Sequence, residues 1–79
     1  MPRFFFHLRS PETFLEDEIG LELPDIGHVK AEAQQGARDV MAEDLRAGRI
    51  IDHHSFEICD EGGETVLVVT FRDMVLLKP

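Results

Sequence analysis

Side chains that could together form a transition-metal site occur at His7, His53, His54 and Cys59. Zinc sites usually combine two pairs of ligands, each pair closely spaced in the sequence. Here His53 and His54 are adjacent, so their side chains diverge in an extended chain, His7 is remote from them, and Cys59 is the single thiol. The spacing favours surface polar residues over a metal site, and we expect Cys59 to be an unreactive thiol.

Carboxylates are concentrated in residues 12–25, a segment without a basic residue. Such a segment could bind a hard cation or contact a basic partner. Its spacing does not fit an EF-hand loop, so we favour a solvated acidic loop whose last member caps a helix. The acidic residues of the segment are Glu12, Glu16, Asp17, Glu18, Glu22 and Asp25.

Asp44 occupies the least expected position of any acidic residue, because it falls within the apolar stripe of a predicted helix. A half-buried carboxylate needs a partner. We favour a structural role, in which Asp44 pairs with Arg49 or Arg72 or accepts backbone N–H groups from the loop that follows. The functional alternative is that Asp44 forms one half of a ligand site.

No recognisable catalytic motif accompanies these residues. The chain lacks a phosphate-binding glycine loop, a nucleophile elbow and a His-Glu-x-x-His helix. Serine occurs only at Ser10 and Ser55, and neither has a local base. We therefore predict a protein that is not an enzyme and that carries no cofactor.

Length and charge restrict the possible functions further. The 79 residues have room for one domain, with a core over residues 2–73 and an apolar tail over 74–79. A net charge of −8 repels phosphate backbones and anionic membranes, so we expect neither nucleic acid nor a membrane as partner. The N-terminus lacks the apolar core of a signal peptide, and no stretch is long enough to span a membrane. These features predict a cytoplasmic protein.

Four strands and one helix are expected to position these residues. Alternating apolar residues predict strands over 3–9, 13–16 and 55–60, and the nearly continuous apolar run at 65–71 predicts a strand buried on both faces. A helix is expected between an N-cap at Asp25 and a glycine stop. The residues to which we assign structural roles in turns, caps and helix ends are Gly20, Pro24, Asp25, Asp44, Gly48 and Gly63.

This order of elements predicts an α+β fold, a two-layer ββαββ roll with one long helix across one face of a four-stranded mixed sheet. Numbering the strands along the chain, we expect the order 2-1-4-3, the plan of a ubiquitin-like roll. A right-handed crossover through the helix would place the strand at 65–71 beside the first strand and parallel to it. The two most apolar strands would then be central.

One helix covers only one face of a sheet, so the other face needs a partner. We expect Phe5 on that face, with either Val66 and Val68 or the alternate residues of the same strand. The apolar tail, a second copy of the chain or another protein could cover it, and a small core gains most from a homodimer. The interaction surface that we predict consists of Phe5, His7, Leu67, Val69 and Phe71.

Several segments match the pattern of a known family. They are Pro2-Arg3-Phe4-Phe5-Phe6-His7, Asp17-x-x-Gly20-x-x-Leu23-Pro24-Asp25, Asp44-Leu45-Arg46-Ala47-Gly48, and Ile58-x-Asp60-Glu61-x-Gly63 with Phe71-Arg72-Asp73. Over nearly its whole length the chain resembles the small bacterial proteins grouped as domain of unknown function 6894. It differs at Phe4, where the family often has tyrosine, and in a longer tail. The resemblance implies a small, cytoplasmic bacterial protein without an assigned activity, and it names no catalytic residue.

Together these observations predict a non-enzymatic accessory or regulatory module that self-associates through the uncovered sheet face. The alternative is a small-molecule or metal-binding domain that uses His7 with the His53–His54 pair or with Asp44.

Overall fold

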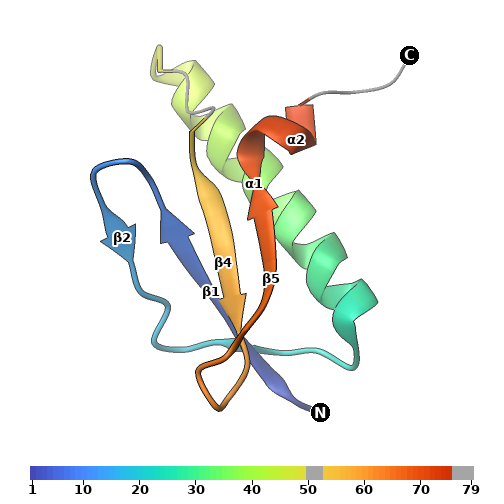
Figure 1. The fold of residues 1–79 in the computed structure, drawn as a ribbon. Helices are drawn as coiled ribbons and strands as arrows, with labels where there is room; N and C mark the ends of the chain where they lie inside the picture. Colours follow the sequence, from blue (N-terminus) through green and yellow to red (C-terminus); the bar gives the residue numbers. More distant parts are fainter. Residues whose placement is uncertain (50–52, 76–79) are drawn as a thin grey trace.

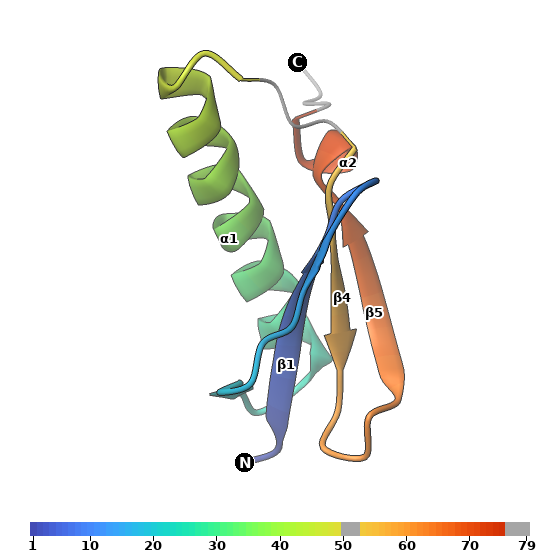
Figure 2. The ribbon, with the colours of Figure 1, turned by 90° about the vertical axis from the view of Figure 1, so that its left-hand side faces the viewer.

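A computed structural model describes residues 1–49 and 53–75 of the chain. The elements are β1 (Arg3–Arg9), β2 (Phe14–Leu15), β3 (Leu21–Glu22), α1 (Ile26–Arg46), β4 (Ser55–Cys59), β5 (Thr65–Thr70) and α2 (Phe71–Val75). The five strands form one antiparallel sheet, and α1 lies across one of its faces (Figures 1 and 2). The predicted α+β class with one long helix is confirmed.

The predicted strand order is wrong, and so are the predicted four strands and mixed orientation, because all pairings among the five strands are antiparallel. The observed order is β2-β1-β4-β5, and β3 also pairs with β1, so β4 and not β5 is the neighbour of β1. Helix α1 carries the chain back to the end of the sheet where β1 finishes, and β4 therefore runs antiparallel to β1 (Figure 1). Five residue pairs join the two strands, from Phe5 opposite Cys59 to Arg9 opposite Ser55. Strand β5 consequently lies at the edge.

Side-chain pairs across the β1–β4 junction account for this order. Arg9 and Glu57 form an ion pair, and the rings of Phe6 and Phe56 meet edge to face with centroids 6.2 Å apart. By contrast, the nearly continuous apolar run in β5 does not make that strand central. The side chain of Val68 on β5 is exposed, which an edge strand tolerates and a central strand of a covered sheet would not.

The hydrophobic core lies between α1 and the sheet. Val29, Ala33 and Ala37 form the buried stripe of the helix, and the buried sheet residues are Phe4, Ile58 and Val69. The small residues of α1 let the helix approach the sheet closely. An added Cβ at Gly36 would lie only 3.4 Å from the ring of Phe56.

The ends of α1 agree with the capping expected from the sequence. The Asp25 carboxylate accepts the His28 N–H at 2.9 Å, which satisfies one of the free N–H groups of the first turn. At the other end Ala47 is the C-cap, and Gly48 follows with a φ of +81°, a conformation that glycine adopts without a steric penalty.

The chain turns into a second helix where a continued strand was expected. Phe71 begins α2, and the Thr70 hydroxyl donates to the Asp73 carboxylate at 2.6 Å across its first turn. Phe71 is fully buried, and α2 packs against α1 (Figure 1). The described part of the predicted tail therefore lies on the helix side of the sheet, and residues 76–79 lie outside the described residues.

Candidate functional site on the open sheet face

The sheet face that α1 does not cover, here called the open face, carries His7 and Phe5 of β1 beside Glu57 and Cys59 of β4. The register explains this grouping, because Phe5 lies opposite Cys59 and His7 lies opposite Glu57, and directly opposed residues share a face. Val68 of β5 extends the same face, since it lies opposite Glu57.

Three residues of the predicted interaction surface lie on the other side of the sheet. Val69 belongs to the buried core, and Leu67 packs against that core. Phe71 lies beyond the strand, in α2, with its ring 5.1 Å from that of Phe56. The alternation in β5 was predicted correctly. However, Leu67 and Val69 face the helix, and Val68 is the residue that faces outward.

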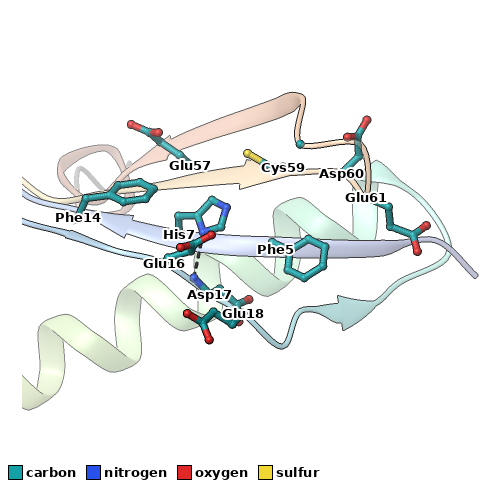
Figure 3. Close-up of a pocket in the computed structure, with 11 residues that line it drawn as sticks. Phe5, His7, Phe14, Glu16, Asp17, Glu18, Glu57, Cys59, Asp60 and Glu61 are labelled. Atoms are coloured by element: carbon teal, nitrogen blue, oxygen red, sulfur yellow. Dashed lines mark hydrogen bonds between the residues drawn. The ribbon is translucent and has the colours of Figure 1, made fainter.

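A groove of about 560 Å³ is hollowed into the open face. Its floor comes from β1 and β4, and its walls come from the segment that follows β2 and from the β4–β5 turn (Figure 3). Among the described residues that line it, six are acidic and none is lysine or arginine. The lining residues are Phe5, His7, Phe14, Glu16, Asp17, Glu18, Glu57, Cys59, Asp60, Glu61 and Gly63.

Asp17 fixes the wall of the groove to β1. Its carboxylate accepts the N–H of Phe6 at 3.0 Å and the N–H groups of Ile19 and Gly20, each at 3.1 Å. Its own N–H donates to Nδ1 of His7 at 3.0 Å (Figure 3). Two of these four hydrogen bonds join the segment between β2 and β3 to β1, and the other two order the segment itself.

The bond from Asp17 also determines the tautomer of His7. A backbone N–H can only donate, so Nδ1 of His7 must be the acceptor, and the proton of the neutral ring is on Nε2. His7 lines the groove, and it therefore offers one N–H donor among carboxylates that only accept. Protonation of Nδ1 would place two N–H groups against each other and break the anchor.

The pKa of Asp17 is lowered from its ordinary value of 3.8. Partial burial raises this pKa, but the N–H groups of Phe6, Gly20 and Ile19, together with His7, favour the charged form and outweigh burial. Asp17 is therefore ionised at neutral pH and contributes a full negative charge to the groove.

Gly20 and Arg3 complete the anchoring of this segment. Gly20 has a φ of +77°, and a Cβ there would lie 2.9 Å from Cγ of Arg3 and 2.9 Å from a ring carbon of Phe5. The Arg3 guanidinium donates to the Ile19 carbonyl at 2.9 Å and pairs with Glu22 at 3.3 Å. Only glycine fits at this position without strain.

The aromatic end of the groove is built around Phe14. The guanidinium carbon of Arg9 lies 4.5 Å from the centroid of the Phe14 ring, and the His7 ring lies 5.4 Å from it. Because Arg9 is also paired with Glu57, its charge is already balanced at the edge of the groove.

Of the other metal-capable residues, Cys59 shares the groove with His7, whereas His54 does not. His54 packs against Phe71, with ring centroids 5.8 Å apart, on the helix side of the sheet. Cys59 lines the groove, and its sulfur lies 3.6 Å from the Thr65 hydroxyl. Among residues 1–49 and 53–75, no group of three or more histidine, cysteine or acidic side chains is arranged to hold a metal ion.

Asp44 has a local partner at the end of α1. Its Oδ1 accepts from both Nη2 and Nε of Arg49, at 2.8 and 3.2 Å, and its carbonyl accepts the Arg49 N–H at 2.7 Å. Of the partners considered from the sequence, the structure selects Arg49. The carboxylate stabilises the chain just after the helix and lies apart from the groove.

Sequence reasoning missed much of the groove. It treated Asp17 as one member of a solvated loop, although the Asp17-x-x-Gly20 spacing is typical of an Asp side chain that accepts N–H groups two and three residues later. It also explained Asp60 by the hairpin turn alone. The turn is present, because Asp60 accepts the N–H groups of Gly62 and Glu64 at 2.9 and 3.0 Å, but the turn also forms one wall of the groove.

Comparison with known proteins identifies a family. A model of the family described as Domain of unknown function (DUF6894) matches residues 3–72, in agreement with the resemblance of the sequence segments. No curated protein and no solved structure matches the chain. The residues that anchor the wall of the groove, Arg3, Asp17 and Gly20, lie within the matched range.

Proposed function

The chain belongs to the family of domain of unknown function 6894, and from its geometry we propose that it is a non-enzymatic interaction module whose groove binds a positively charged segment of a partner protein. One observation carries this proposal. A groove of about 560 Å³ on an uncovered sheet face combines six carboxylates with two phenylalanine rings, and no lysine or arginine is present among the described residues that line it.

The charges of the groove suit lysine and arginine side chains. A single solvated ion pair contributes only about 0.2 to 1 kcal/mol, so useful affinity requires several carboxylates that act together. Carboxylates stand on both walls: Glu16, Asp17 and Glu18 on one, and Asp60 and Glu61 on the other. An extended basic segment that lies between the walls would contact both groups.

Aromatic rings give the groove a second means of recognition. Phe14 already accepts the guanidinium of Arg9 over its face, and the groove presents Phe5 as a further ring. Aromatic faces attract cationic side chains, and the methylene stems of lysine and arginine can cover apolar surface. The groove therefore suits a basic peptide better than a bare metal ion.

The groups that could perform catalysis already have structural partners. Nδ1 of His7 accepts a backbone N–H, and the Asp17 carboxylate accepts three. The Cys59 sulfur contacts the Thr65 hydroxyl. These roles support a binding function for the groove in preference to acid–base or nucleophilic chemistry.

Self-association through the open face is a weaker candidate than the sequence suggested. Two open faces that met would bring six carboxylates from each copy together, and like charges in contact oppose association. The metal-binding alternative loses support because His7, His54 and Asp44 lie in different parts of the structure. A cationic small molecule remains a second candidate, since the same carboxylates would attract it.

Binding of a fluorescently labelled lysine-rich decapeptide, measured by anisotropy, tests the proposal. We expect binding that weakens as salt is added, because the ion pairs are screened. The double variant Glu16→Lys/Glu18→Lys should weaken binding at least tenfold, and acetylation of the peptide lysines should do the same.

The matched control is Glu32→Lys/Glu43→Lys, which changes the net charge equally on exposed positions of α1. It should bind nearly as well as the wild type. Equal losses in the two double variants would show that only net charge matters and would contradict a specific groove. Binding of spermine, measured by calorimetry, without any affinity for the peptide would indicate the small-molecule candidate.

A further inference from the structure

Strand β5 is a long sheet edge without charged residues in a strongly acidic chain. Its six residues, Thr65–Thr70, are threonine, valine and leucine, whereas the whole chain is 30% charged with a net charge of −8. The strand pairs with β4 on one side and is the last in the sheet order. Val66 and Val68 are 38% and 53% exposed.

The backbone of β5 directs hydrogen-bonding groups away from the sheet. Phe71 donates its N–H to the His54 carbonyl at 2.9 Å, and hydrogen-bonded pairs alternate along an antiparallel ladder. In the observed register, Val69 therefore directs its N–H and C=O toward β4. The same groups of Val68 and the N–H of Thr70 point outward, toward the position of a further strand, while the Thr70 C=O lies at the start of α2.

Natural sheets usually protect such an edge with a charged side chain, a proline or a very short strand. The other edge of this sheet follows that rule, because β2 and β3 are two residues each and the Asp17 side chain lies between them on β1. Strand β5 contains neither a charge nor a proline. Its one irregularity is the shift in register opposite Ile58 and Cys59, near its first residues.

The position of α1 leaves room for another strand. In Figure 1 the N-terminal half of the helix extends past β5, behind the edge of the sheet. A strand added to β5 would therefore continue the sheet in front of the same helix layer.

We propose that a second copy of this chain pairs with the outer edge of β5, strand against strand, to form a two-fold symmetric dimer. The outward N–H and C=O of Val68 are self-complementary, because two copies of Val68 can exchange both hydrogen bonds in an antiparallel pairing, and the N–H of Thr70 adds a donor. A second copy is favoured over an acidic or basic partner because the edge has no charge to select either. The pairing adds buried surface to a domain whose core is small.

Light scattering and sedimentation equilibrium on the full chain, from micromolar to millimolar concentration, test the dimer. We expect a mass that rises toward twice the 9.0 kDa of one chain. Val68→Lys puts a charge at the paired edge of both copies and should leave a monomer at concentrations where the wild type is dimeric. Leu15→Lys is the matched control, since Leu15 is an exposed residue of the opposite edge, and it should stay dimeric.

Amide hydrogen exchange on the wild type makes the test independent of any variant that fails to fold. The outward amides of Val68 and Thr70 should exchange more slowly as the protein concentration rises. A wild-type mass of 9.0 kDa over the whole range would overturn the proposal. A dimer that persists in the Val68→Lys variant, or that dissociates in the Leu15→Lys variant, would also overturn it. The same holds for a dimer that forms without slowing the exchange of the Val68 and Thr70 amides.

Discussion

Asp17 replaces a strand partner for β1. Between β2 and β3 the outer edge of β1 lacks a paired strand, and the Asp17 carboxylate accepts the Phe6 N–H that such a strand would have bonded. Because the same carboxylate accepts the N–H groups of Ile19 and Gly20, one side chain closes the edge and shapes the groove wall. The closure of this edge and the shape of the groove wall therefore depend on the same residue.

Substitution Asp17→Asn should destabilise the fold by about 1 to 3 kcal/mol, because it removes charge-assisted hydrogen bonds and turns an amide donor toward backbone donors. Urea unfolding near neutral pH measures the loss. Glu18→Gln, which removes a charge from the exposed neighbour, is the control and should change the free energy of unfolding little. Similar losses in both variants would show that the anchor is not what stabilises this segment.

The lowered pKa of Asp17 predicts a specific dependence on acid. Its folded-state pKa lies below the ordinary 3.8, so its contribution to stability is fully present above that value and is lost as the pH falls through the folded-state pKa. The difference in free energy of unfolding between the wild type and Asp17→Asn should therefore shrink below about pH 4. Chemical unfolding over an acid series checks this, and a constant difference would contradict it.

Gly20 and Gly48 separate two costs of adding a side chain. Both have positive φ, +77° and +81°, but a Cβ at Gly20 meets Arg3 and Phe5 at 2.9 Å, whereas a Cβ at Gly48 has nothing within 4 Å. Gly48→Ala should cost about 1 to 2 kcal/mol for the backbone conformation alone. Gly20→Ala should cost more by about 1 to 3 kcal/mol from overpacking, measured by the same urea titrations. Equal losses of stability in the two variants would show that Arg3 and Phe5 can move aside without a measurable cost.

At the level of elements, α1 carries its own local signals and β5 does not. The N-cap Asp25 and the glycine after Ala47 are read from neighbouring residues, so the helix could be predicted almost to the residue. The strand order depends on which strand meets β1, and this is decided by side chains remote in sequence, such as Arg9 with Glu57. Periodicity alone contains no information about that choice.

The close contact of α1 with the sheet predicts a stabilising substitution. Glycine inside a helix costs roughly 0.5 to 1 kcal/mol relative to alanine, and a Cβ at Gly36 would be in ordinary contact, 3.4 Å from Phe56. Gly36→Ala should therefore raise the melting temperature, as measured by circular dichroism. Ala42→Gly is the control, because Ala42 is exposed and the change alters helix propensity alone. It should lower the melting temperature by a similar amount. A loss of stability in Gly36→Ala would show that Phe56 cannot adjust.

For the whole molecule, the sequence predicted the two layers and an uncovered sheet face, but not what the face contains. Alternation in β5 yields two sets of residues without saying which set meets the helix, and Phe71 continues the apolar run although it begins α2. The Thr70-x-x-Asp73 pattern is a local sign of that helix start. The groove gathers residues from β1, β4 and two separate loops, so its carboxylates could not be assembled before the fold was known.

In the described chain, neither helix is long and apolar enough to cross a membrane.

The unequal edges of the sheet limit how many copies can join. A sheet with two long free edges offers a new end after each addition, and growth of that kind has no natural limit. Here one margin is divided between two strands of two residues and a side chain, and only β5 presents a run of six. Once two β5 strands have paired, neither outer margin can accept another copy. In the proposed dimer, the β5 strands would occupy each other's free edges, and assembly would stop at two chains instead of continuing into fibrils.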